Sequence, residues 1–146
     1  PAHRLELEIT ETVLLDHNQS TENFMNELGA AGVRFALDDF GTGYSSLGYL
    51  HKYPFGKIKV DRSFVSGVNV GKKSDAIIRA VSGMGATLGM AIVAEGLETV
   101  EQVEAVREAG CTLGQGYYFS RAVPDYVAAM LLSQERDSLK SQRLAS

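Results

Sequence analysis

The segment spanning residues 34–47 constrains the fold of this chain more than any other stretch of its sequence. An apolar run ends there in the adjacent carboxylates of Asp38 and Asp39, and a glycine-flanked turn follows directly. This order is typical of a buried strand that delivers charge to the edge of a site. Aspartates also cap turns, but two adjacent acids repel each other unless a cation lies between them. The segment therefore favours a buried strand that leads into a charged site.

Five segments have the composition of strands, and most of them end in a polar side chain. Residues 5–9 and 57–61 alternate apolar and charged positions, whereas residues 90–94 are apolar throughout, as in a parallel sheet covered on both faces. The other two strands are expected at residues 33–37 and 111–116. The polar residues at the strand ends are Glu8, Asp38, Asp39, Lys59, Glu95 and Gln115.

Helical segments separate these strands. We expect helices from Ser20 to Gly32, from 45 to 53, from Ser74 to Gly89, from Thr99 to Gly110, and from Pro124 onward. A glycine lies at each of three junctions between a helix and the following strand, at positions 32, 89 and 110. Thr99 and Gln102 have the spacing of a capping box.

This alternation predicts an α/β fold with parallel strands, in which sites form at the carboxyl ends of the strands. Taken singly, Glu8 and Lys59 also fit half-exposed surface strands, whereas Glu95 after a fully apolar strand does not. Two architectures compete, namely a small doubly wound sheet of receiver type and the last five units of an eight-unit barrel. A receiver requires its acid pair after the first strand, and here the pair follows the second. The partial barrel, lacking its first three strand–helix units, is the better prediction.

Composition and charge restrict the classes of partner and the cellular setting that fit this chain. The 146 residues carry a net charge of −4 without a basic run, which argues against a nucleic-acid polymer as partner. Cys111 is the single cysteine, so no disulfide framework is expected and a reducing, cytoplasmic setting is the simplest. No apolar run suggests membrane contact or a signal peptide. We expect one domain over residues 1–132 and a polar tail over residues 133–146. The abrupt start of the chain is typical of the middle of a domain.

Five short motifs follow one another along the chain, namely Glu8-Ile9-Thr10-Glu11, Asp38-Asp39-Phe40-Gly41-Thr42-Gly43, Lys59-Val60-Asp61, Ala94-Glu95-Gly96-Leu97-Glu98 and Gln115-Gly116-Tyr117. In this order and spacing they resemble the EAL family of bacterial phosphodiesterases, which cleave cyclic di-GMP. The resemblance covers residues 5–124 and implies a TIM-type barrel that hydrolyses cyclic di-GMP to linear pGpG.

The resemblance also implies roles for individual residues. Glu8, Asp38 and Asp39 correspond to ligands of one or two Mg²⁺ or Mn²⁺ ions, which suit hard carboxylate oxygens. Glu95 corresponds to a residue that helps to activate the attacking water, and Lys59 to a cation that positions this water or offsets phosphate charge.

Supporting positions follow from the same resemblance. Asp61, Glu98 and Gln115 correspond to residues near the metal or the substrate. Glu11 corresponds to a residue that fixes the loop beginning with Phe40, Gly41, Thr42 and Gly43, which couples dimer packing to metal binding in the family.

The glutamate that opens the family's Glu-Ala-Leu motif and an asparagine ligand have no counterpart in this chain. Two hypotheses follow. In the first, the chain is part of an active cyclic di-GMP phosphodiesterase but is inactive by itself. In the second, it is a non-catalytic module for cyclic di-GMP binding or dimerisation. Because a partial barrel has open edges, we expect a homodimer or larger assembly.

Overall fold

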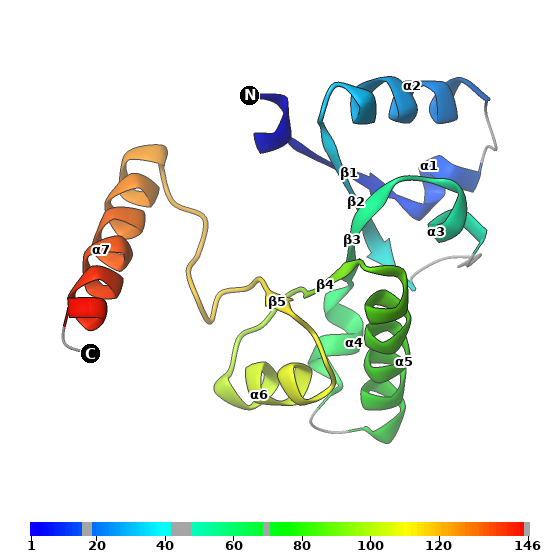
Figure 1. Ribbon diagram of the computed structural model, residues 1–146. Coiled ribbons are helices and arrows are strands. Elements are labelled where there is room, and N and C mark those ends of the chain that lie inside the picture. The colour runs from blue at the N-terminus through cyan, green and yellow to red at the C-terminus, as the bar shows by residue number, and fades with distance from the viewer. Residues whose placement is uncertain (16–18, 42–47, 69–70, 145–146) are drawn as a thin grey trace.

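The structure, a computed structural model, describes residues 1–15, 19–41, 48–68 and 71–144. Its centre is a five-stranded parallel sheet in the order β1-β2-β3-β4-β5 (Figure 1). The strands are β1 (Glu6–Thr10), β2 (Arg34–Phe40), β3 (Phe55–Val60), β4 (Ala91–Ala94) and β5 (Leu113–Gly114). In a barrel, strands that are consecutive in sequence are also neighbours in the sheet, whereas a doubly wound sheet reverses its strand order part-way. The order observed here is that of a barrel.

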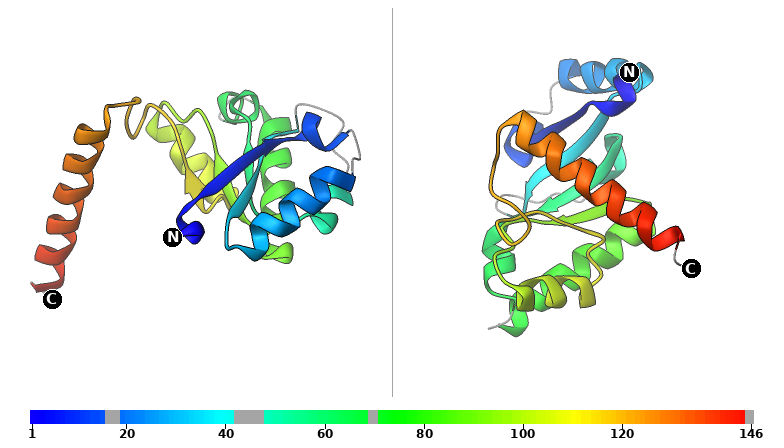
Figure 2. Two further views of the ribbon diagram at one scale, coloured as in Figure 1. Left: turned by 90° about the horizontal axis from the view of Figure 1, so that it is seen from above. Right: turned by 90° about the vertical axis from the view of Figure 1, so that its left-hand side faces the viewer.

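Helices alternate with the strands. They are η1 (Ala2–Arg4), α1 (Glu11–Leu15), α2 (Gln19–Ala30), α3 (Gly48–Lys52), α4 (Arg62–Ser66), α5 (Lys72–Leu88), α6 (Val100–Glu108) and α7 (Asp125–Leu144). The last helix, α7, stands apart from the sheet in Figure 1 and in the left-hand view of Figure 2. The part of the chain that the structure describes contains no helix long and apolar enough to cross a membrane.

The hydrophobic core lies between one face of the sheet and the helices. Phe35, Leu37 and Ile58 are at most 1% exposed, and they belong to one apolar cluster with Met25 of α2 and Ile78 of α5. Burying a side chain of this size stabilises the fold by roughly 1.5–3 kcal/mol. Successive side chains of a strand point to opposite faces, so the residues between these core positions lie on the other face of the sheet.

The helix boundaries predicted from capping signals are confirmed in part. Thr99 caps α6 by accepting from the backbone N–H of Gln102, and the reciprocal bond completes the capping box. The glycines at the helix-to-strand junctions adopt positive φ, for example 70° at Gly89, which is the C-cap of α5.

Other predicted boundaries are wrong. Ser20 lies inside α2 rather than capping it, and α5 begins at Lys72 rather than at Ser74. The strand β2 extends past its predicted end at Asp38 to Phe40. The segment from Ser133, predicted as a helix end followed by a loose tail, remains helical up to Leu144.

Three short helices were not predicted, namely η1, α1 and α4. Each spans three to five residues, which is too short for a repeat of apolar residues to become visible in the sequence. Residues 16–18 and 42–47 lie outside the described part of the chain, so the predicted helix over 45–53 is confirmed only for Gly48–Lys52.

Gly116 allows the segment after β5 to cross the backbone of Leu97. A Cβ atom at position 116 would collide with the backbone oxygen and nitrogen of Leu97. Two hydrogen bonds fix the crossing: the Leu97 N–H donates to Gln115 O at 3.1 Å, and the Tyr118 N–H donates to Leu97 O at 2.9 Å. This contact holds the end of β5 beside the end of β4.

We therefore expect Gly116→Ala to lower the free energy of unfolding by about 2 kcal/mol, because overpacking against backbone atoms cannot relax easily. Gly56→Ala is the matched control, since nothing lies within 4 Å of a Cβ at that position, and we expect it to leave stability almost unchanged. Urea unfolding measures both variants. Equal effects at the two positions would contradict the account.

Candidate active site

The ammonium group of Lys59 is the centre of the charged cluster at the carboxyl end of the sheet. Its Nζ lies 2.7 Å from Glu8 Oε2, 2.8 Å from Glu95 Oε1 and 3.1 Å from Asp38 Oδ1. The Lys59 side chain is only 7% exposed. Four residues predicted to form a site are thus brought together in space.

Neighbouring strands deliver these side chains. Glu8 lies on β1, Asp38 on β2 and Lys59 on β3, while Glu95 follows β4 directly. The backbone N–H of Glu95 donates to Val60 O at 3.1 Å, which keeps the end of β4 beside β3. Parallel pairing in consecutive order is therefore the reason that charges far apart in sequence meet here.

Asp39 joins the cluster through an uncommon backbone conformation. Its φ of 54° lies in the left-handed region, where aspartate is better tolerated than most residues. The pairing between β2 and β3 is irregular over Leu37 to Phe40, so the strand turns both aspartates toward the same region. Carboxylate oxygens of Asp38, Asp39 and Glu95 all lie within 4.8 Å of one another.

The cluster changes the protonation behaviour of its members. Burial works to lower the pKa of Lys59, but the carboxylates of Glu8, Glu95 and Asp38 outweigh it, so the pKa of this ammonium is raised. Burial raises the pKa of Glu95, and the nearby Lys59 offsets this only in part. Lys59 therefore stays charged at neutral pH, and Glu95 holds its proton to a higher pH than an ordinary glutamate.

The donor set fits a divalent cation. Asp38 Oδ1 is buried and accepts no hydrogen bond of good geometry from any described group, although it lies within ion-pair distance of Lys59. Three carboxylates this close repel one another, and hard oxygen ligands of this kind suit Mg²⁺ or Mn²⁺. Glu95, predicted as a water-activating residue, belongs to this group, whereas Glu8, predicted as a ligand, lies against Lys59 instead.

The predicted supporting residues line a neighbouring cavity of about 240 Å³. Asp61, Glu98 and Gln115 contribute to its wall together with Glu95. Asp61 also has a structural task, since its side chain accepts a 2.9 Å hydrogen bond from the Ser63 N–H and caps α4. These hydrogen bonds from Ser63 lower the pKa of the Asp61 carboxyl.

Glu11 is buried, and its Oε2 has no hydrogen-bond partner among the described groups. Phe40 is the buried last residue of β2, and a Cβ at Gly41 would meet the Phe64 ring at 2.9 Å. Thr42 and Gly43 lie outside the described residues, so the predicted contact between Glu11 and this loop stays a prediction.

Sequence reasoning missed two features beside the cluster. Lys57 Nζ lies 2.8 Å from Glu6 Oε1 on the same face of the sheet as Lys59. On the cavity side, the Arg121 guanidinium lies over the Tyr117 ring at 4.4 Å. Alternation in β1 and β3 signals the first pair, because Glu6 and Lys57 precede Glu8 and Lys59 by two residues.

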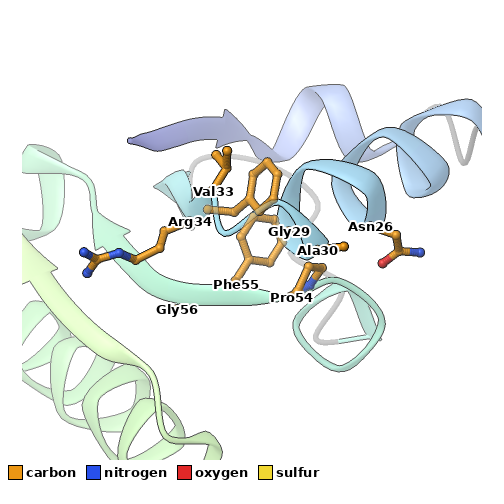
Figure 3. Close-up of a pocket in the computed structure, with 9 residues that line it drawn as sticks. Asn26, Gly29, Ala30, Val33, Arg34, Pro54, Phe55 and Gly56 are labelled. Atoms are coloured by element: carbon orange, nitrogen blue, oxygen red, sulfur yellow. The ribbon is translucent and has the colours of Figure 1, made fainter. Parts of the chain in front are cut away.

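A further cavity lined by described residues lies away from this site. It measures about 550 Å³ and lies at the opposite ends of β2 and β3, with Val33 and Phe55 among its lining residues (Figure 3). Arg34 is its charged residue, and the guanidinium donates to His3 O at 2.9 Å and 2.6 Å. This cavity lacks an acid, a base or a nucleophile to carry chemistry.

The sequence was compared with models of known protein families. The model of the EAL domain matches residues 1–122. The chain belongs to the EAL family. This membership confirms the resemblance carried by the strand-end motifs, and it identifies the five-stranded sheet as part of an EAL barrel.

Curated relatives include phosphodiesterases. This EAL chain is 43% identical to the cyclic di-GMP phosphodiesterase NbdA of Pseudomonas aeruginosa, over 82% of the chain and 15% of the relative. It is 40% identical to the cyclic di-GMP phosphodiesterase RocR of the same organism, over 86% of the chain and 32% of the relative. The chain thus spans less than a third of the length of these relatives.

Solved structures agree with the fold. The EAL domain of Mycobacterium smegmatis DcpA superposes with a TM-score of 0.85 at 35% identity, covering 92% of this chain and 60% of that one. Klebsiella pneumoniae BlrP1, in a complex with manganese and cyclic di-GMP, superposes with a TM-score of 0.78 at 35% identity, covering 82% and 31%.

Lys59→Met tests the central ion cluster. We expect the free energy of unfolding to fall by roughly 2–4 kcal/mol. This loss is smaller than for a fully buried ion pair, because Glu8 is half exposed. At neutral pH the ammonium of Lys59 contributes its full stabilisation, which is lost only as pH rises through the raised pKa of this lysine.

The defect of Lys59→Met should depend on pH. As pH falls through the raised pKa of Glu95, protonation removes part of the repulsion among the acids, so the loss of stability shrinks. Thermal unfolding at pH 5 and pH 8 measures this difference. Lys52→Met is the matched control, because Lys52 forms an exposed 2.7 Å pair with Glu22 and should show little effect at either pH. A defect in Lys59→Met that is identical at both pH values would be inconsistent with repulsion as its cause.

Proposed function

We propose that this EAL chain forms part of the active site of a phosphodiesterase that hydrolyses cyclic di-GMP to linear pGpG with Mg²⁺ or Mn²⁺. The observation that carries the proposal is the group of Asp38, Asp39 and Glu95 carboxylates within 4.8 Å of one another. The names of NbdA and RocR support the choice of substrate, and the BlrP1 complex with manganese supports the choice of ion.

Each side chain has a distinct part in this proposal. Asp38 and Asp39, with Glu8 after it leaves Lys59, would hold one or two divalent ions. Such ions acidify a bound water and neutralise charge on the phosphate. Glu95, whose pKa is raised by burial, accepts a proton from the attacking water, because a general base works best when its pKa approaches the working pH.

Lys59 supplies permanent positive charge beside the phosphate. Its pKa is raised, so the ammonium does not donate its proton readily and acts through electrostatic attraction. The cavity lined by Asp61, Glu98 and Gln115 opens next to Glu95. We assign this cavity to the nucleotide, with Gln115 oriented by a backbone that bonds to Ala94 and Leu97.

We propose further that turnover requires the rest of the EAL domain. The chain covers 60% of the DcpA EAL domain and 32% of RocR, so other residues of the domain complete the substrate site. In this proposal the chain alone binds cations but does not hydrolyse the dinucleotide, and the domain operates in the cytoplasm.

A non-catalytic module for cyclic di-GMP binding or dimerisation is the second candidate function. Each outer strand, β1 and β5, pairs with a neighbour on one side only among the described strands, which leaves strand edges open to pairing. Large apolar side chains are also exposed from the end of β5 into α7, namely Tyr117, Tyr118, Phe119, Val123, Tyr126, Met130, Leu131 and Leu132. A surface of this kind favours association.

Glu95→Gln in the complete EAL protein should reduce the rate of pGpG formation by a factor of roughly 10²–10⁴, the usual contribution of a general base. Chromatography of the nucleotides in the presence of Mn²⁺ measures this rate. Glu104→Gln on the exposed face of α6 is the control and should retain full activity. Wild-type protein that binds cyclic di-GMP without forming pGpG would refute the enzymatic proposal and favour the binding module.

Assembly can be tested on the 146-residue chain itself. We expect light scattering to give the mass of a dimer or a larger species, because the open edges and the exposed apolar residues are covered by association. Tyr126→Glu together with Met130→Glu, two exposed α7 positions, should shift the mass toward the monomer. A monomer before any substitution would refute the assembly.

A further inference from the structure

A second ion pair lies directly beside the active-site cluster on the same face of the sheet. Lys57 Nζ is 2.8 Å from Glu6 Oε1, and both side chains are slightly more than a quarter exposed. Lys59 and Glu8 form the equivalent pair one step further along the same two strands. Both pairs bridge β1 and β3 across the intervening strand β2.

The strand register gives Glu8 two possible lysine partners. Glu8 pairs with Ala36, and Ala36 pairs with Lys57, so Glu8 and Lys57 occupy the same row across the sheet. The side chain of Ala36 is too small to separate them. Glu8 nevertheless contacts Lys59, and Lys57 turns to Glu6, which pairs with Arg34 in a different row.

We infer that Glu6 is a positioning residue, which holds Lys57 away from Glu8 and so keeps Glu8 and the neighbouring carboxylates available to a divalent cation. This inference rests on the proposed cation site and concerns residues to which the family motifs assign no role.

The surrounding cavity supports this role. About 290 Å³ of open space is lined by Glu6, Glu8, Lys57 and Lys59, so the lysine side chains have room to move. Glu6 and Glu8 are the acids among the described residues that line it. An ammonium released by Glu6 therefore has Glu8 as its alternative partner, across the small side chain of Ala36.

If Lys57 turned to Glu8, two ammonium groups would face the Asp38, Asp39 and Glu95 carboxylates instead of one. A unit charge brought several ångströms closer to a bound cation in a partly solvated site weakens binding by roughly 3- to 10-fold.

The test is a titration of the purified protein with Mn²⁺ alone, followed by electron paramagnetic resonance of the free ion. Glu6→Gln should raise the Kd for Mn²⁺ by roughly 3- to 10-fold, because the released Lys57 ammonium moves closer to the bound cation. The double variant Glu6→Gln with Lys57→Gln should return the Kd close to its original value, because the competing ammonium is gone. Thermal unfolding of each variant establishes that the fold is retained.

Glu22→Gln is the matched control, since it breaks the Glu22–Lys52 ion pair of 2.7 Å away from the site and should leave the Kd unchanged. An unchanged Kd in Glu6→Gln would overturn the inference. So would equal weakening in Glu6→Gln and in the double variant, because Glu6 would then act without Lys57. Absence of Mn²⁺ binding in the unsubstituted protein would overturn the cation site itself and this inference with it.

Discussion

The ammonium of Lys59 is the interaction on which the charged end of this sheet depends. Lys59 is buried, and carboxylates from three other positions along the sheet lie within 3.1 Å of its Nζ. Without a counter-charge, acids packed this closely would repel one another or bind protons. Lys59 therefore lets the fold assemble a group of acids, which we propose as the cation site.

The arrangement of the sheet makes this cluster possible. Parallel strands in consecutive order bring the ends of β1 to β4 to one edge, and apolar side chains such as Ile58 bury the opposite face under the helices. Charged residues then occur at every second position of β1 and β3 without disturbing the core. The small side chain of Ala36, between these strands, leaves space for ion pairs that cross β2.

Sequence patterns predicted the strands, the barrel-type order and the family, because apolar alternation and strand-end acids are local signals. They did not predict α1 and α4, which are too short to show periodicity, or that Asp61 caps α4. Alternation in β1 and β3 places Glu6 and Lys57 on the charged face of the sheet, but their direct pairing also depends on the strand register, which is irregular near Ala36. The positive φ of Asp39 and the grouping of Glu95 with the two aspartates likewise depend on the three-dimensional structure and have no local signal in the sequence.

The most direct test of the account locates the cation. Crystals soaked in Mn²⁺ and measured at the manganese absorption edge should show an anomalous peak within bonding distance of the Asp38 and Asp39 carboxylates, with the Lys59 ammonium displaced from Asp38. This result would establish that the acids gathered by Lys59 form a cation site. No peak there at saturating Mn²⁺, with the Lys59 ion pairs intact, would contradict the central claim and leave the cluster a purely structural one.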